Sequence, residues 1–468
     1  MIPPKPPARP DRVSLWRHLR LFRADILSSQ PARLFRAWMA EFRTPFFRSY
    51  LCNDPDLIDR VLRDEPDRFP KSARIAEGLR PLLGRSVFLT NGEDWQRQRR
   101  IIDPAFEGGR LRTVLPSLWE AAIGLRDRLA AAAVVEGAGG GAGHGGPVEV
   151  EAETSHAAAD AIFRALFSVP ISDADAAAVF QEFRTFQRSQ PLLNVGAFLP
   201  LPGWVPRGHR PGARRAAARI RARIHAMTLR RQAEIAAGRA PQDLATRLMT
   251  TPDPRTGVPF DADEMVDQVA IFFLAGHETS ASALAWALWL VAGDAALQDR
   301  LAAEAAAALP GDAVPAYEAT GRLALARDVF REALRLYPPV PMMVRETACP
   351  MRMRDRAVPR GAQIVLSPWH LHRHEALWDA PDAFDPDRWS RPEGRASARR
   401  AYLPFSAGPR VCPGAGFAML EGPLMLALVL RDLRLATVAD RLPEPVAHLT
   451  LRSKSGIWLA FSQRHPAL

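Results

Sequence analysis

The sequence predicts a mainly α-helical protein with a small β region, folded as one domain over residues 1–468. Apolar residues recur three and four positions apart through most of the chain, which is the spacing of a helix that buries one face. Alternation typical of strands is confined to short segments. Hydrophobic residues make up 47% of the 468 residues, enough for a large core. No long charged or Ser/Gly-rich linker divides the chain into independent units.

The elements follow in order along the chain. Helical periodicity is clearest at 111–135, 153–167, 173–188, 210–237, 263–293 and 413–433, and strand-like alternation at 147–151 and 362–366. Residues 263–293 form the longest apolar run, but polar residues such as Asp267 and His277 interrupt it. The pattern therefore predicts a buried central helix and not a membrane span.

Three other segments lack this periodicity. We expect residues 1–12 to be flexible and residues 137–146 to form a Gly-rich surface loop. Residues 191–204 are apolar and too Pro-rich for a long helix, so they predict either a mobile lid or a segment packed against neighbouring helices. No apolar run follows the N-terminal residues, so the sequence predicts neither a signal peptide nor an anchor, and we expect a cytoplasmic protein.

Charge and cysteine usage limit the function classes. The net charge is +11, but nearly all the basic residues are arginines, scattered and not interleaved with aromatic residues as in single-strand binders. We therefore expect no nucleic-acid partner. The three cysteines, Cys52, Cys349 and Cys412, are odd in number and far apart, which argues against a disulfide framework and leaves room for one functional thiolate.

The strongest motif surrounds Cys412. Phe405, Gly408, Arg410, Cys412 and Gly414 resemble the haem-binding signature of the cytochrome P450 family, F-x-x-G-x-R-x-C-x-G, at all five fixed positions. The glycines permit tight turns, and a helix expected to begin at the following proline would favour a thiolate through its free amide groups. The resemblance implies a mainly α cytochrome P450 fold and haem b as cofactor. It also implies that Cys412 is the axial ligand of the iron, that Arg410 contacts a propionate, and that all five residues bind the cofactor.

A second motif lies within the expected central helix. Ala275, Gly276, Glu278 and Thr279 resemble the family's oxygen-binding pattern, A-G-x-[D/E]-T. Glycine inside a helix lowers stability by about 1 kcal/mol relative to alanine. The space that Gly276 leaves for dioxygen would explain why a glycine stands there. The resemblance implies that Ala275 and Gly276 line the cofactor. Glu278 and Thr279 would be catalytic, with Thr279 holding oxygen and Glu278 relaying protons through water.

A third set of residues resembles the family's structural brace. Glu332 and Arg335 match E-x-x-R, and positions three apart share one face of a helix. Arg388, in a downstream segment that also resembles a family pattern, would complete a buried network behind Cys412. We assign these three residues a structural role.

Further residues resemble the family's contacts to the haem propionates. Trp95 and Arg99 match W-x-x-x-R, and four-residue spacing puts both on one helix face. Arg345 resembles an arginine on a strand that reaches the same groups. The order of all these motifs along the chain strengthens each one.

A cluster of histidines needs separate weighing. His370, His372 and His374 alternate, and on a strand they would share a face that could bind a metal. His372 and the arginine after it stand where the family commonly has His-Arg. We therefore favour capping or packing over a second metal site.

The resemblance implies a monooxygenase that inserts one atom of dioxygen into a hydrophobic small molecule. We expect a monomer that receives electrons from NAD(P)H through a reductase and a separate ferredoxin or flavodoxin, docked near Cys412 and steered by Arg97, Arg100, Arg399 and Arg400. Two alternatives remain open. A peroxygenase would use hydrogen peroxide, although such relatives usually lack the acid–alcohol pair. A non-catalytic haem sensor would not need Glu278 and Thr279.

Overall fold

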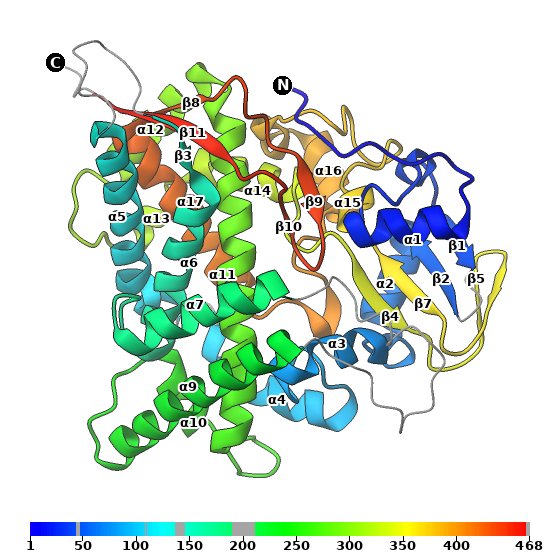
Figure 1. Ribbon diagram of the computed structural model, residues 1–468, viewed down its shortest axis with the longest axis horizontal. Coiled ribbons are helices and arrows are strands. Elements are labelled where there is room, and N and C mark those ends of the chain that lie inside the picture. Colours follow the sequence, from blue (N-terminus) through cyan, green and yellow to red (C-terminus); the bar gives the residue numbers. More distant parts are fainter. Residues whose placement is uncertain (44–46, 108, 110, 136–145, 190–210, 465–468) are drawn as a thin grey trace.

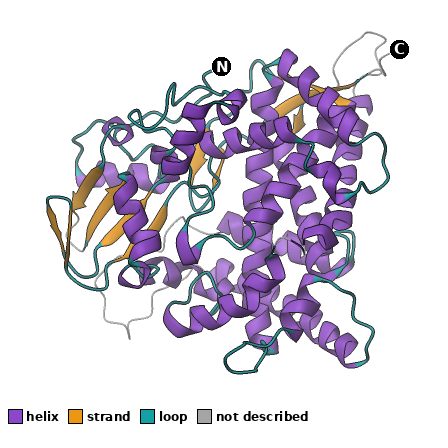
Figure 2. Ribbon diagram, turned by 180° about the vertical axis from the view of Figure 1, so that it is seen from behind, coloured by secondary structure: helices purple, strands orange, loops and turns teal. Residues whose placement is uncertain are grey.

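The computed structural model describes residues 1–43, 47–107, 109, 111–135, 146–189 and 211–464. Helices pack around one long central helix, and most of the sheet lies to one side of them (Figure 1). The view from behind shows the same separation of helix-rich and strand-rich parts (Figure 2). The predicted class, mainly α with a small β region, is confirmed.

The helices account for most of the described chain. They are α1 (Leu15–Ala24), α2 (Pro55–Asp59), α3 (Ala73–Leu83), α4 (Gly92–Phe106), α5 (Leu111–Val135), α6 (Val150–Phe167), α7 (Ala174–Ser189), α9 (Pro211–Ala236), α10 (Leu244–Thr250), α11 (Ala262–Ala292), α12 (Ala295–Ala308), α13 (Tyr317–Thr320), α14 (Ala324–Leu336), α15 (Pro368–Leu371), α16 (Pro392–Ala401) and α17 (Ala415–Asp432).

The strands form small sheets. They are β1 (Met39–Arg43), β2 (Arg48–Cys52), β3 (Val148–Glu149), β4 (Met343–Glu346), β5 (Met351–Met353), β6 (Arg356–Val358), β7 (Gln363–Leu366), β8 (Leu433–Thr437), β9 (Pro445–Ala447), β10 (Leu451–Ser453) and β11 (Trp458–Gln463). The largest sheet has the order β1-β2-β7-β4, with β2 parallel to β7 and the other pairs antiparallel.

One predicted strand is too long. Alternation suggested a strand over residues 147–151, but β3 ends at Glu149 and α6 begins at Val150. The Glu149 side chain accepts hydrogen bonds from the amides of Glu151 and Ala152, so it caps the helix. Capping of the first free amides stabilises an early helix start, and this local effect overrides the alternating pattern.

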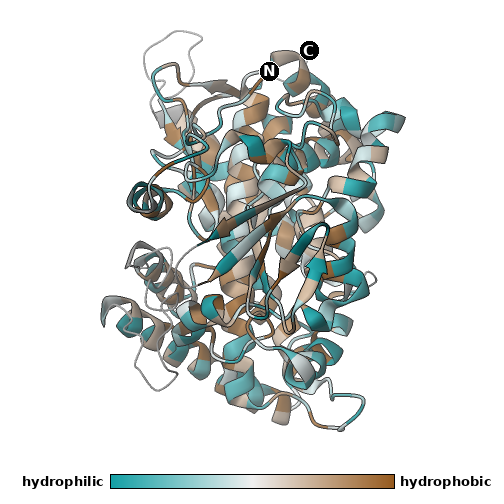
Figure 3. Ribbon diagram, turned by 90° about the vertical axis from the view of Figure 1, so that its right-hand side faces the viewer, coloured by the Kyte–Doolittle hydropathy of each residue, from teal (hydrophilic) through white to brown (hydrophobic). Residues whose placement is uncertain are grey.

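The central helix α11 has a capping box, in which Asp261 and Glu264 each bond the other's backbone amide. It packs against α3, α6, α9, α14 and α17. The polar residues that interrupt its apolar run hold its neighbours, because the Asp267 carboxylate accepts from the Arg85 amide and the Gln268 side chain accepts from the Val87 amide. Hydrophobic residues are prominent in the elements at the centre of Figure 3.

The described helices differ from membrane spans in length and hydropathy. No single one of them is both long and apolar enough to cross a membrane, although α11 and α12 pass as a pair bent by 119°. Most α11 residues are buried inside the protein.

The N-terminal residues 1–12 differ from the predicted flexible segment, because they pack on the body of the protein. The Phe384 amide donates to the Met1 carbonyl at 2.9 Å, the Tyr337 hydroxyl donates to the Pro4 carbonyl at 2.7 Å, and Lys5 forms an ion pair with Asp382. A Pro-rich segment has few amide donors of its own but keeps its carbonyls, which these partners use. The predicted lid at 191–204 and the Gly-rich loop, except Gly146, lie outside the described residues.

Candidate functional site

Cys412 lies in a loop that ends at α17. Its amide donates to the Phe405 carbonyl at 2.9 Å, which closes the loop. Cys412 is exposed, and desolvation by the protein around it raises the pKa of its thiol. The Gly414 amide and the Arg99 guanidinium act in the opposite direction and lower this pKa. The sulfur is thus accessible within the interior and lies near groups that favour a thiolate.

The helix after Cys412 starts later than predicted. We expected it to begin at Pro413, but α17 begins at Ala415, with Gly414 as its N-cap residue. The Ala415 amide donates to the Cys412 carbonyl at 3.3 Å, so Pro413 and Gly414 form a turn before the helix. The amide that lies near the sulfur therefore belongs to the cap of α17 and not to its first turn.

Gly408 has a specific steric role. Its φ is +67°, and a Cβ at this position would lie 1.9 Å from the Leu62 carbonyl oxygen. Glycine is therefore required at this position both for the left-handed conformation and for close contact with the backbone at Leu62. Gly414 has a φ of −81°, and its added Cβ would only meet the Cys412 sulfur at 3.9 Å. Gly408 therefore forms the predicted tight turn and lies against the Leu62 backbone.

A cluster of cationic side chains surrounds Trp95 near this loop. Lys71, Arg99 and Arg410 lie over its ring at 5.6, 6.0 and 5.1 Å from the ring centroid. Lys71 also faces Arg345 across an isolated antiparallel bridge. Arg99 donates to the carbonyl of Val411 at 2.6 Å, which ties α4 to the cysteine loop.

The cluster is electrostatically unfavourable on its own. Burial, together with Arg345, Arg410 and Arg99, lowers the pKa of Lys71 to about 6. Burial and Arg410 lower the pKa of Arg345 to about 10. The Nε atoms of Arg345 and Arg410 are buried with no hydrogen-bond partner in the described structure. Such an arrangement suits a ligand that brings carboxylates.

Lys71 was missed by the sequence analysis. The one feature of the sequence that could have pointed to Lys71 is the rarity of lysine. The chain has lysine at just three positions, Lys5, Lys71 and Lys454, among many arginines. Arg410, predicted to contact a propionate, also donates to the Pro66 carbonyl at 2.5 Å and forms a 3.5 Å ion pair with the exposed Asp67.

The oxygen-motif residues sit where α11 opens to accessible space. Ala275 is exposed, and Gly276 and Thr279 are partly exposed, although the helix is otherwise largely buried. The Thr279 hydroxyl donates to the Ala275 carbonyl at 2.6 Å. Gly276 has a packing reason that was not predicted: a Cβ there would lie 3.1 Å from Ile162 Cδ1 on α6. The small residue therefore lets α6 and α11 approach closely.

Glu278 is directed toward the β9–β10 hairpin. Its carboxylate accepts hydrogen bonds from the Thr450 hydroxyl and the Arg452 guanidinium. Burial alone would raise the pKa of Glu278, but Arg452, Thr450 and His277 together lower it. The contact of these two hairpin residues with Glu278 was not predicted, because more than 170 positions separate them from it.

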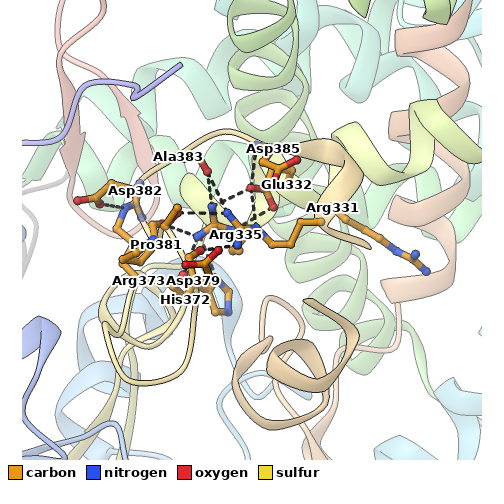
Figure 4. Close-up of polar contacts among 12 residues, drawn as sticks. Arg331, Glu332, Arg335, His372, Arg373, Asp379, Pro381, Asp382, Ala383 and Asp385 are labelled. Carbon is orange, nitrogen blue, oxygen red and sulfur yellow. Dashed lines mark hydrogen bonds and ion pairs between the residues drawn. The ribbon is translucent and has the colours of Figure 1, made fainter. Parts of the chain in front are cut away.

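The predicted brace is brought together as a buried network (Figure 4). Arg335 donates to the two Glu332 carboxylate oxygens at 2.9 and 2.7 Å, and both side chains are fully buried. Arg335 also bonds the Pro381 and Ala383 carbonyls at 2.6 and 2.8 Å. Arg388 reaches Glu332 at 3.3 Å. Arg388 also donates to the carbonyls of Asp379, Ala380 and Ala383, so the two arginines together hold residues 379–383.

The three histidines point to different partners, and the strand geometry assumed for them is wrong, since they lie on α15 and the turn after it. His370 Nδ1 lies 2.8 Å from the Ser367 hydroxyl, and His374 stacks on Trp38. His372 Nε2 accepts from the Leu403 amide at 2.8 Å, so its Nδ1 carries the proton and donates to the Arg335 carbonyl at 3.2 Å. His372 thus links the brace to the cysteine loop.

These residues fit one kind of cofactor. An accessible buried sulfur suits an iron ligand, a cationic cluster suits two carboxylates, and α17, which follows Cys412, packs against α11. This combination defines a haem-thiolate protein. The chain matches the family described as cytochrome P450 over residues 33–460, and it belongs to that family. It is therefore an oxidoreductase that incorporates oxygen, with haem b as cofactor.

Similar proteins include bacterial members. Cyclooctat-9-en-7-ol 5-monooxygenase of Streptomyces melanosporofaciens is 32% identical and covers 91% of this chain and 87% of its own length. Cyclooctatin synthase of the same organism is 30% identical, covering 86% and 84%. The crystal structure of the cytochrome P450DA heme domain superposes with a TM-score of 0.79 at 24% identity, covering 99% of this chain and 98% of that chain, which supports the fold.

Proposed function

We propose that this protein inserts one atom of dioxygen into a hydrophobic small molecule, with electrons supplied from NAD(P)H by a reductase and a separate ferredoxin or flavodoxin. The observation that carries the proposal is the accessible Cys412 sulfur together with Thr279 and Glu278 on α11. Cytoplasmic location, a single domain and a monomeric state stay predictions from the sequence.

Cofactor binding is assigned to the residues around the loop and the cationic cluster. Cys412 would be the axial ligand of the iron, and a thiolate ligand supplies the electron density that promotes O–O cleavage when haem is bound. Arg99, Arg345 and Arg410, with Lys71 added from the structure, would bind the propionates. Trp95, Phe405, Gly408, Gly414, Ala275 and Gly276 would shape the pocket around the macrocycle.

Proton handling is assigned to Thr279 and Glu278. The Thr279 hydroxyl is partly exposed on the open face of α11 and donates to the Ala275 carbonyl, and it would be free to donate to the dioxygen substrate instead. Glu278 is the next residue to Thr279 in the sequence, and its neighbours Arg452 and Thr450 lower the pKa of its carboxyl group. An acid and an alcohol in this order are suited to supply protons in a site that excludes bulk water.

Two observations support an apolar substrate: the residues of α11 next to the oxygen motif and the name of one relative. Directly before the oxygen motif, α11 carries the apolar and buried residues Phe272, Phe273 and Leu274. One Streptomyces relative is named as a monooxygenase of an unsaturated alcohol, cyclooctat-9-en-7-ol. An apolar substrate of comparable kind is consistent with both observations.

The electron donor is proposed to dock near the start of α17. A pocket of about 430 Å³ there is lined by Gly416 and Met419 of α17, by Arg327, and by Arg112, which already pairs with Glu318 of the same pocket at 2.7 Å. Arg327 has a buried Nε with no hydrogen-bond partner in the described residues. The Cys412 loop immediately precedes α17, so an acidic donor seated in this pocket would lie close to the thiolate.

Two arginines predicted to steer the donor are already engaged. Arg97 pairs with Glu264, and Arg100 pairs with Asp253 at 2.6 Å and with Glu93 at 2.9 Å. Their charges are neutralised within the protein, so they contribute less to an external field. Arg399 and Arg400 are exposed on α16 and remain candidates.

Turnover with heavy-isotope dioxygen tests the proposal. The protein, a ferredoxin, its reductase and NADPH are supplied with a panel of terpenoids, fatty acids and aromatic compounds, after a screen for ligand-induced spectral shifts. Incorporation of one labelled atom that depends on the reductase supports the monooxygenase. Product formed equally well from hydrogen peroxide alone would favour a peroxygenase. Tight haem binding without product from any donor would favour a sensor.

A further inference from the structure

A second pocket lies outside the haem site, where α5, α6 and α7 meet in the helix-rich part of the protein (Figure 1). Its volume is about 240 Å³. Pockets that hold drug-sized molecules are larger, at roughly 300–1,000 Å³. The described residues that line it include none that we assigned to the cofactor or to oxygen. The pocket therefore has room for a small molecule that is separate from the haem and from its substrate.

One positive charge in this pocket is unbalanced. Among the described lining residues, Glu153 of α6 is the one carboxylate, and Arg128 of α5 already donates to it at 2.8 Å. Arg184 of α7 lines the same pocket and pairs with no carboxylate in the part of the chain that the structure describes. Its guanidinium lies over the Phe180 ring, 5.9 Å from the ring centroid. A ligand with one carboxylate would balance this charge, because a guanidinium can donate to both oxygens of the group.

His156 adds an uncharged polar group to the wall. It forms no hydrogen bond within the described structure, and its Nδ1 atom is buried without a partner. Burial and the neighbouring Arg128 lower the pKa of His156, whereas Asp160 and Glu153 oppose this shift to a smaller extent. The ring is therefore mainly neutral at pH 7. Arg184 thus carries the single free charge of the pocket.

The rest of the wall is apolar and fixed in place. Phe180 is 5% exposed and Ile171 is 6% exposed. The Phe180 ring stands edge-on to His156 and also to His277 of α11, with ring centroids 6.2 and 5.8 Å apart. The Ile171 amide donates to Asp160 at 2.7 Å, which holds the loop between α6 and α7. Such a preset wall can bind the apolar body of a ligand with little loss of side-chain freedom.

The charge and the apolar wall together define the class of ligand. An inorganic anion such as phosphate would pair with Arg184 but has no apolar body to place against Phe180 and Ile171. A neutral apolar molecule would fill the wall and leave the guanidinium without an anion. A small carboxylic acid with an aromatic or aliphatic body satisfies both parts of the pocket.

We propose that the pocket between α5, α6 and α7 is a binding site for a small monocarboxylate whose charged group pairs with Arg184 and whose apolar body lies against Phe180 and Ile171. The site is distinct from the haem pocket and goes beyond the proposed function.

Isothermal titration calorimetry of the haem-loaded protein with benzoate at pH 7 tests the site. We expect saturable binding that weakens at least about tenfold in Arg184→Gln, since a hydrogen bond to a charged group contributes that much or more. Arg184 is partly exposed, so this variant should fold. Arg215→Gln is the matched control and should bind benzoate as the wild type does, because Arg215 is exposed on α9 and does not line the pocket.

Two further probes separate the charge from the apolar body. Benzamide has the shape of benzoate without its charge, and inorganic phosphate has the charge without the ring. Each should bind the wild-type protein at least about tenfold more weakly than benzoate. Phosphate that binds as tightly as benzoate would overturn the apolar part of the site, and benzamide that does so would overturn the role of Arg184.

The Soret band is recorded during the same titrations. Equal benzoate affinity in Arg184→Gln and the wild type would overturn the proposal, and a Soret shift that follows this binding would place benzoate in the haem pocket instead. The absence of saturable binding to the wild type would overturn it as well. None of these measurements needs turnover, so they decide the site separately from the proposed monooxygenase reaction.

Discussion

Lys71 and Arg345 face one another across an isolated antiparallel bridge, which places two cationic side chains together in the interior. Neither side chain can neutralise the charge of the other. The Nε atom of Arg345 is also buried without a hydrogen-bond partner in the described structure. Like charges at this spacing oppose folding unless an anion joins them. We propose that this bridge forms part of a site for the two haem propionates.

The protonation of Lys71 should make haem affinity depend on pH. Its pKa is lowered to about 6 when no anion is present, and a propionate beside it would raise that pKa. Haem binding above pH 6 then requires proton uptake by Lys71, so this residue contributes less affinity as pH rises. Haem transfer to an excess acceptor protein should therefore speed up more with pH in the wild type than in Lys71→Met.

The comparison with Lys71→Met cancels other titrations, such as that of Cys412, which both proteins share. Lys454→Met is the matched control, because Lys454 is exposed and pairs with Glu444 at 3.0 Å on the surface. It should behave like the wild type. Identical pH dependence in Lys71→Met and the wild type would remove Lys71 from the propionate site.

Gly408→Ala should prevent stable haem incorporation. The left-handed conformation alone costs an L-residue about 1–2 kcal/mol, and the added Cβ would collide with the Leu62 carbonyl at 1.9 Å. Gly78→Ala is the control, since nothing lies within 4 Å of its added Cβ in α3 and alanine favours a helix. Haem per protein after purification is the measurement. Full haem content in Gly408→Ala would show that the loop can relax away from Leu62.

Glu332→Gln should lower the free energy of unfolding by about 3–5 kcal/mol, because it leaves the buried Arg335 without its counter-charge. Asp59→Asn, which breaks the half-exposed pair with Arg63, should cost less than about 1 kcal/mol. Denaturant unfolding of the haem-loaded proteins gives both values. Equal costs in the two variants would mean that the buried network contributes no more than a surface pair.

Much of this site could be predicted because short-range patterns carry it. The five fixed positions around Cys412 and the three-residue spacing of Glu332 and Arg335 are local in sequence, and the long apolar period of α11 identified the central helix. The structure brings Glu332, Arg335 and Arg388 into contact, as the motifs predicted.

The missing parts depend on contacts between distant segments. Arg452 and Thr450 reach Glu278 from a hairpin near the end of the chain, and Lys71 meets Arg345 across more than 270 positions. The spacing of apolar residues along one helix or strand gives no information about contacts between segments so far apart in the sequence. The errors at the start of α6 and α17 have a different cause, because side-chain and turn hydrogen bonds set a helix start within one or two residues.

Thr279→Ala should bind substrate and accept electrons, yet form less product per NADPH, because the hydroxyl that donates toward oxygen is gone. The lost electrons should appear as hydrogen peroxide. Thr279→Ser keeps the hydroxyl and should keep most of the coupling. The measurement is the ratio of product to NADPH with peroxide assayed in parallel. Equal ratios in the alanine variant and the wild type would exclude Thr279 from proton delivery.

The absorption spectrum of the reduced carbon monoxide complex tests the central assignment most directly, since the red shift of its Soret band reports thiolate ligation. The wild-type protein should show the red-shifted band, and Cys412→His should bind haem but lose it. Cys349→Ser, which removes another partly buried cysteine, should retain it. A red-shifted band that survives in Cys412→His would contradict the assignment of Cys412 as the haem-iron ligand.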